Sequence, residues 1–86
     1  TNTAMPTAFL LQQMAWRDSL EESADDFAAL DALATEVDSA YQAALLELAE
    51  AMDQTHNYQR AAELLRGLLF IDKFATELDD AIAALA

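Results

Sequence analysis

The side chains that could do chemistry in this chain are few and scattered. His56 is the single histidine, and the sequence has no cysteine, which removes thiolate nucleophiles, disulfides and cysteine-bound zinc or iron–sulfur sites. His56 falls in a predicted break between helices with no ligand set beside it, so we expect an ordinary surface residue. Gly67 is the single glycine, which excludes a glycine-rich phosphate-binding loop. We therefore predict no cofactor and no metal site.

Carboxylates are abundant, but no two of them share a predicted core face. The chain carries 16 Asp and Glu against 4 Lys and Arg, a formal charge of −12. The Glu-x-x-His spacing of di-iron helical bundles does not occur. General acid–base catalysis lacks the buried pair of acids that it needs. We expect a protein without enzymatic activity.

A different chemistry is suggested by Asp18-Ser19-Leu20, the tripeptide that carries phosphopantetheine in acyl carrier proteins. Those proteins are also small, acidic and helical. Their serine, however, opens a helix after a long loop near mid-chain, whereas Ser19 falls inside the first predicted helix. An acidic helical carrier with phosphopantetheine on Ser19 stays an alternative function.

The charge balance also limits the partners. Phosphate contacts need Lys and Arg, and the chain has only four such residues, so we expect no nucleic acid and no anionic membrane surface. No run of about 18 uncharged apolar residues occurs, and the start lacks the basic region of a signal peptide. We expect residues 1–6 to be an N-terminal remnant or linker, and residues 7–86 to be one soluble domain.

The elements that must position these side chains are predicted to be helices. The chain has one glycine, one proline and 55% hydrophobic residues, with few β-branched ones, a composition that favours helix over strand. Breakers and capping residues gather at three places, which predicts helices near residues 7–22, 26–53 and 58–85. Ser23 with Asp26 resembles a capping box, and Asn57 is a predicted cap. Because short breaks force antiparallel neighbours, we predict an all-α, three-helix antiparallel (up-down-up) bundle.

Apolar periodicity predicts which faces of the later two helices are buried. In the second helix the predicted core face is long: Phe27, Leu30, Ala34, Val37, Tyr41, Leu45, Leu48 and Met52. In the third helix it is centred on five residues: Leu64, Leu68, Ile71, Leu78 and Ile82. Gly67 is expected to allow the close approach of another helix; the alternative is that it is merely tolerated within its helix at a cost of about 1 kcal/mol.

Two apolar lines compete for the core in the predicted first helix. One continues along the helix: Phe9, Gln13, Trp16 and Leu20. The other lies about 100° or more away and runs into charged residues: Leu10, Leu11 and Met14, then Arg17, Asp18, Glu21 and Glu22. We predict that the first line faces the core and that the second is an exposed, charged face with an apolar end. The alternative is one wide buried arc that includes both.

Phe70 raises a matching question, because its neighbours along the third helix are polar. Either it is exposed on a hydrated stripe, or the twist of the bundle buries it. If Phe70, Leu10, Leu11 and Met14 are all exposed, they form an apolar surface that a monomer rarely leaves uncovered. Burying the four side chains is worth about 6–12 kcal/mol gross. Because association itself costs free energy, we expect a transient contact of about micromolar affinity. The partner surface should be basic and carry an apolar pocket.

Two segments carry a family resemblance. The first is Thr7-Ala8-Phe9-Leu10-Leu11-Gln12-Gln13-Met14, continuing as Ala15-Trp16-Arg17-Asp18-Ser19-Leu20-Glu21-Glu22. The second, about sixty residues on, is Leu68-Leu69-Phe70-Ile71-Asp72-Lys73-Phe74. Together they resemble the C-terminal domain of HscB-type co-chaperones of iron–sulfur cluster assembly, where the second motif reads L-x-F-[LI]-D-K. The resemblance covers nearly everything after residue 5.

The resemblance implies a domain that binds the iron–sulfur scaffold protein IscU within a J-domain co-chaperone of the heat-shock ATPase HscA. No His-Pro-Asp tripeptide occurs, so we expect the J-domain, and with it the HscA contact, to be absent from this chain. Carried over by position, the scaffold-binding residues are as follows: Leu10, Leu11, Met14 and Phe70, with the acidic Asp18 and Glu22. Ala15 replaces a third acidic position and Leu69 a basic one, which suggests a more apolar contact.

The resemblance implies a compartment as well, the bacterial cytoplasm or, in a eukaryote, the mitochondrial matrix. Besides the phosphopantetheine carrier, a self-associating structural bundle remains an alternative. Such a bundle would use the same apolar residues for contact between copies.

Overall fold

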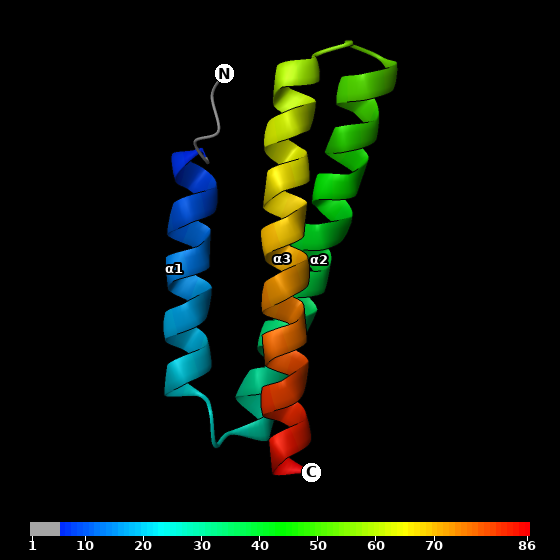
Figure 1. Cartoon of the computed structure of the whole chain (residues 1–86). Coiled ribbons are helices and arrows are strands. Elements are labelled where there is room, and N and C mark those ends of the chain that lie inside the picture. The colour runs from blue at the N-terminus through cyan, green and yellow to red at the C-terminus, as the bar shows by residue number, and fades with distance from the viewer. Residues whose placement is uncertain (1–5) are drawn as a thin grey trace.

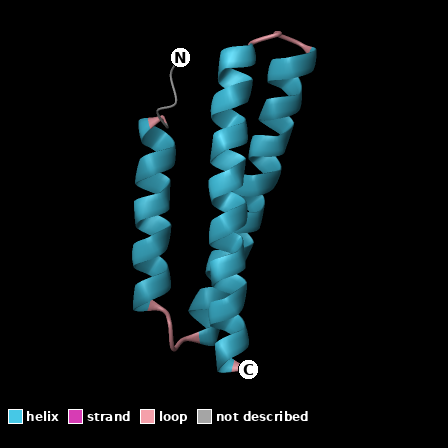
Figure 2. Ribbon diagram, in the orientation of Figure 1, coloured by secondary structure: helices cyan, strands magenta, loops and turns pink. Residues whose placement is uncertain are grey.

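The computed structural model describes residues 6–86, which form three helices: α1 (Thr7–Glu22), α2 (Phe27–Asp53) and α3 (Tyr58–Leu85). α1 lies alongside α3 and runs in the same direction, while α2 runs the opposite way (Figure 1). Loops occur only at the two turns and the ends of this part of the chain, which contains no strand (Figure 2). The predicted up-down-up bundle is confirmed. Of the predicted N-terminal remnant, residues 1–5 lie outside the described residues.

Local capping sets where α2 and α3 begin. The Asp26 carboxylate accepts a 3.2 Å hydrogen bond, and the Asn57 side chain a 3.1 Å hydrogen bond, each from the backbone N–H three residues further on. Each satisfies an amide that has no partner within its helix. The cap at Asn57 is confirmed. The predicted capping box from Ser23 is wrong, because Asp26 is itself the N-cap and α2 therefore begins at Phe27.

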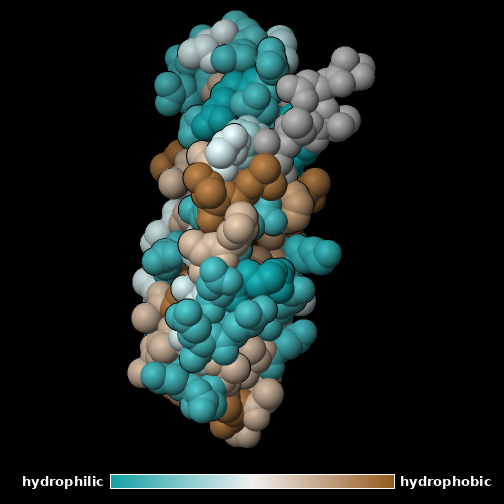
Figure 3. Space-filling view, turned by 90° about the vertical axis from the view of Figure 1, so that its left-hand side faces the viewer, coloured by the Kyte–Doolittle hydropathy of each residue, from teal (hydrophilic) through white to brown (hydrophobic). Residues whose placement is uncertain are grey.

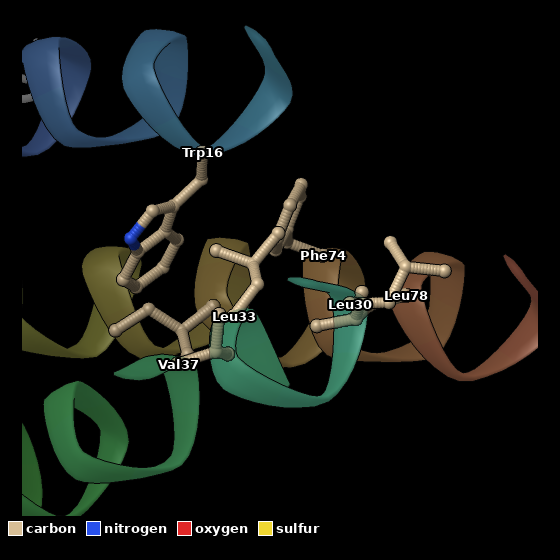
Figure 4. Close-up of a cluster of buried hydrophobic side chains, with 7 residues drawn as sticks. Trp16, Leu30, Leu33, Val37, Phe74 and Leu78 are labelled. Atoms are coloured by element: carbon tan, nitrogen blue, oxygen red, sulfur yellow. The ribbon is translucent and has the colours of Figure 1, made fainter. Parts of the chain in front are cut away.

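The main core lies between α2 and α3, and Trp16 of α1 closes one side of it. Trp16 is only 4% exposed, and its ring stacks on Phe74 of α3 with centroids 5.6 Å apart. Its indole N–H donates to the carboxylate of Glu36 on α2. Figure 4 shows Trp16 reaching from α1 toward Leu33 and Val37 of α2 and Phe74 of α3. One aromatic residue thus joins α1 to both other helices.

Two further contacts align α1 on α3. The ring of Phe9 rests on Gly67, where an added Cβ would lie 2.7 Å from the Phe9 Cζ. The absence of a side chain is therefore what lets the ring sit so close, and the predicted role of Gly67 in a close approach is confirmed. Further along, Arg17 donates to the Glu77 carboxylate at 2.8 Å. These contacts fix how far α1 is shifted along α3.

The predicted core face is correct for α3 and partly wrong for α2. On α3 the predicted residues are buried or, for Ile82, partly buried. On α2, Leu30 and Val37 are buried, but three predicted core residues are exposed: Phe27, Leu45 and Met52. The second half of α2 instead buries Ala44 and Ala51. The reason is that α1 has 16 residues against 27 in α2 and lies on one side only, so no helix within residues 6–86 covers the other edge of the α2 stripe.

Candidate partner-binding site

The four predicted apolar site residues all lie on the surface. Leu10 and Phe70 are 45% and 41% exposed, and Leu11 and Met14 are 61% and 64% exposed. The other apolar line of α1 faces the core, as predicted, because Trp16 is buried and Phe9 and Leu20 are partly buried. The alternative of one wide buried arc on α1 is therefore wrong. We call Leu10, Leu11, Met14 and Phe70 the apolar patch.

The alignment of α1 and α3 brings the two parts of the apolar patch together. Arg17 and Glu77 are in contact, and stepping seven residues back along each of these parallel helices covers about two turns. That step leads to Leu10 on α1 and Phe70 on α3, so both residues lie on the side of the helix pair where Arg17 meets Glu77.

Phe70 is also packed on its inner side. Together with Gln13 of α1 and Lys73 of α3 it lines a shallow pocket of about 60 Å³. The Gln13 Nε2 atom is buried and has no hydrogen-bond partner among residues 6–86. The pattern of α3 alone suggested that Phe70 is isolated on a hydrated stripe. In the structure, Gln13 of α1 lines the same pocket as Phe70, so Phe70 is not isolated. Half-buried aromatic side chains of this kind, held at one edge and open at the other, are well suited to anchor a partner.

Acidic side chains continue the apolar patch along α1. Asp18 lies four residues after Met14, and Glu22 four residues after Asp18, so the three share one side of the helix. Both acids are exposed and take part in no ion pair within the described part of the chain. Figure 3, which looks onto the side where α1 lies, shows a hydrophobic area in the upper part of this face and a broad hydrophilic area below it. The patch therefore has an acidic border.

Arg60 is engaged with acidic residues of α2 and α3. Its guanidinium contacts Glu47 at 2.7 Å and Glu63 at 3.3 Å and lies 6.0 Å from the centre of the Phe9 ring. The pKa of Arg60 is raised, mainly by the hydrogen bond to Glu47, which outweighs the opposing effect of burial. Arg60 thus neutralises acids of α2 and α3, while Asp18 and Glu22 form no ion pair within residues 6–86.

Within residues 6–86 there is no group of three or more His, Asp or Glu side chains that could hold a metal ion, and none of the three helices is both long and apolar enough to cross a membrane. Ser19 lies in the last turn of α1 and is partly buried, whereas a phosphopantetheine serine would open a helix, which argues against the phosphopantetheine alternative. His56 lies exposed in the turn between α2 and α3, with a φ of 50°.

Residues 5–79 match the protein family described as the HSCB C-terminal oligomerisation domain. The chain belongs to this family. The match includes both of the segments from which the HscB resemblance was drawn, and it spans all of α1 and α2 and most of α3. No solved structure gives a match.

Curated relatives of this HscB-family chain carry a consistent name. Proteins called "Co-chaperone protein HscB homolog" are 41% identical over 78 residues in Bordetella petrii, 39% over 87 in Aromatoleum aromaticum and 42% over 86 in Paraburkholderia phymatum. These alignments cover 91%, 99% and 98% of the chain, but 46%, 49% and 49% of the relatives. The chain thus spans about half the length of the relatives that it matches.

Sequence reasoning missed the residues that hold the apolar patch together. Phe9 and Arg17 position α1 through Gly67 and Glu77, and neither was assigned to the site. One signal was available for Arg17, because it lies three residues after Met14 and so borders the same side of the helix. The pairing of Phe9 with Gly67 has no such signal, since it depends on how two helices distant in sequence are aligned.

Proposed function

We propose that this domain binds an IscU-like scaffold protein of iron–sulfur cluster assembly and presents it to an HscA-like heat-shock ATPase. Membership of the HSCB C-terminal family and the co-chaperone name of the relatives support this role. The observation that carries it is the exposure, on adjoining faces of α1 and α3, of the apolar residues that match the family's scaffold-binding positions. The bacterial cytoplasm is the proposed compartment, since these relatives are bacterial.

The geometry supports a binding mechanism with no catalytic step. Leu10 and Phe70 form the centre of the contact, and Leu11 and Met14 extend it along α1. Covering these side chains removes apolar surface from water, which supplies the affinity. Asp18 and Glu22 at the border steer a basic partner and select against acidic ones. With the scaffold on this patch, contact with the ATPase needs a separate surface, which we propose to be a J-domain joined to this one.

The direct test is calorimetric titration of the chain with an IscU-like scaffold protein. We expect a 1:1 complex with a dissociation constant in the range of about 1–100 μM, since a small apolar contact must also offset the cost of association. The heat-capacity change should be negative, because apolar surface is buried. If the intact, helical chain shows no binding at a scaffold concentration of about 1 mM, the proposal is overturned.

The acidic border should contribute less than the apolar patch. In the variant carrying Asp18→Asn and Glu22→Gln, we expect scaffold affinity to fall by less than about tenfold, and the difference to shrink as salt is added. Both carboxylates are exposed, so their main effect should be on the association rate, measurable by stopped-flow mixing. The matched control neutralises two exposed acids away from the patch, Asp31→Asn and Asp80→Asn. An equal loss in the control would assign the effect to net charge alone.

Self-association through the apolar patch is a second candidate, favoured by the word "oligomerisation" in the family's description. It would bring together two copies that each carry a formal charge of −12, a repulsion that low salt strengthens. Sedimentation velocity of the chain alone distinguishes the two candidates. A monomer supports the scaffold proposal, and a dimer that dissociates when Leu10 and Phe70 become alanine supports self-association.

A further inference from the structure

A second apolar surface lies between α2 and α3, where a groove of about 370 Å³ runs along the two helices. Its floor includes Ala34, Val37 and Leu78, and its rim carries three carboxylates, Asp38, Asp72 and Asp79. We call these residues the α2–α3 groove. None of them belongs to the apolar patch on α1 and α3.

The α2–α3 groove faces away from α1. Trp16 of α1 contacts Glu36 on α2 and Phe74 on α3. Asp38 is two residues after Glu36, and Asp72 is two residues before Phe74, so each rim acid is rotated by about 200° around its helix from a residue that touches α1. The α2–α3 pair therefore has one side covered by α1 and an opposite side that no helix within residues 6–86 covers.

Exposed hydrophobic residues extend this uncovered side in both directions. On α2, Phe27 lies seven residues before Ala34, and Leu45 lies four residues after Tyr41, another lining residue, so both continue the groove side. On α3, Leu65 lies seven residues before Asp72. All three are exposed. These are the α2 residues that the sequence pattern assigned to a core, together with a matching residue from α3, which is the arrangement expected where a further helix docks.

We propose that the α2–α3 groove docks a basic amphipathic helix of another protein. A valley between two packed helices accepts the side-chain ridge of a third one, and the apolar floor requires an apolar face on that helix. The three rim aspartates form no ion pair within residues 6–86, and none of the chain's four cations lines the groove. A partner with lysine or arginine on both sides of its apolar face satisfies them. A second copy of this chain, at −12, brings the wrong charge.

The probe for this proposal is a fluorescently labelled synthetic peptide of about 18 residues, or about 27 Å of helix, with leucine along one face and lysine on the others. Fluorescence anisotropy measures its binding to the whole chain. In the variant with Asp38→Asn, Asp72→Asn and Asp79→Asn, we expect affinity at least about tenfold weaker. The same peptide with glutamate in place of lysine should not bind.

Matched controls separate docking in the α2–α3 groove from general attraction to an acidic protein. The variant with Glu21→Gln, Asp25→Asn and Glu50→Gln removes the same charge from exposed positions outside the groove, and it should bind the peptide within about twofold of the parent chain. The variant with Leu10, Met14 and Phe70 replaced by alanine should also bind it normally, so failure of the scaffold proposal would not affect this result. Amide chemical shifts should change at residues 34–41 and 72–79.

Three outcomes would overturn the proposal. One is an equal loss of affinity in both charge variants. Another is a set of shift changes centred on α1 instead of the groove. The third is a dimer of the chain alone, seen by sedimentation, that the three groove substitutions strengthen, because it would assign the groove to a second copy.

Discussion

Replacing Leu10, Met14 and Phe70 together with alanine should abolish measurable binding of the iron–sulfur scaffold while the three helices stay folded. Each side chain contributes about 1.5–3 kcal/mol when it is fully covered by a partner. The combined loss of about 4–9 kcal/mol approaches the whole binding free energy of a micromolar complex, about 8 kcal/mol. The fold should survive because all three side chains are exposed. Calorimetry gives the affinity, and circular dichroism confirms the helix content.

The control for this variant replaces two exposed leucines outside the apolar patch, Leu46→Ala and Leu85→Ala. It removes a similar kind of apolar surface from α2 and from the end of α3, and scaffold affinity should stay within about twofold of the parent value. Unchanged affinity in the triple alanine variant, with helix content intact, would contradict the assignment of the site and with it the proposed function.

Trp16→Ala is expected to have the largest effect on stability of any single substitution. The side chain is 4% exposed and packs on Phe74, Leu33 and Val37, so truncation leaves a large cavity and should cost about 3–5 kcal/mol. The loss falls mainly on α1, which touches the rest of the molecule at few places. We expect α1 to separate from a folded α2–α3 pair, and scaffold binding to weaken because the α1 part of the apolar patch is no longer held against α3. Urea unfolding measures the first effect and calorimetry the second.

Trp16→Phe is the matched variant for this prediction. It keeps an aromatic ring against Phe74 but loses the hydrogen bond to Glu36. Its cost should therefore be clearly smaller, about 1–2 kcal/mol. A destabilisation below about 1 kcal/mol for Trp16→Ala would show that Trp16 does not hold α1 in place.

The parts of this molecule that could be predicted from sequence depend on short-range interactions. Asn57 marks the start of α3 because a cap acts on the amides of its own first turn. The exposure of Leu10, Leu11 and Met14 follows from their position on α1 relative to Trp16, which helical periodicity fixes. The choice of binding residues also needed the family resemblance, because exposure alone does not separate them from Leu46 or Leu69, which are at least as exposed.

The remaining features depend on how the helices are placed against one another. Periodicity shows that Phe27, Leu45 and Met52 share a side of α2, but not whether another helix covers that side. The answer depends on α1 packing on the opposite side through Trp16. In the same way, the position of the α1 part of the apolar patch relative to Phe70 depends on the axial shift of α1 along α3, which Phe9 and Gly67 set. A single sequence holds no direct signal for which side of α2 is covered or for the axial shift of α1 along α3.

The division of the apolar patch between α1 and α3 has a consequence for the order of folding. α2 and α3 are joined by a turn of four residues, so their contacts close a short loop and should form early, whereas α1 must reach across to α3, about sixty residues away in sequence. The apolar patch therefore forms only after α1, the last helix to pack, has docked on α3. By linkage, a scaffold that binds both helices stabilises the docked state over the undocked one. Amide exchange in α1 should accordingly slow when the scaffold is bound, while that of the α2–α3 pair changes little.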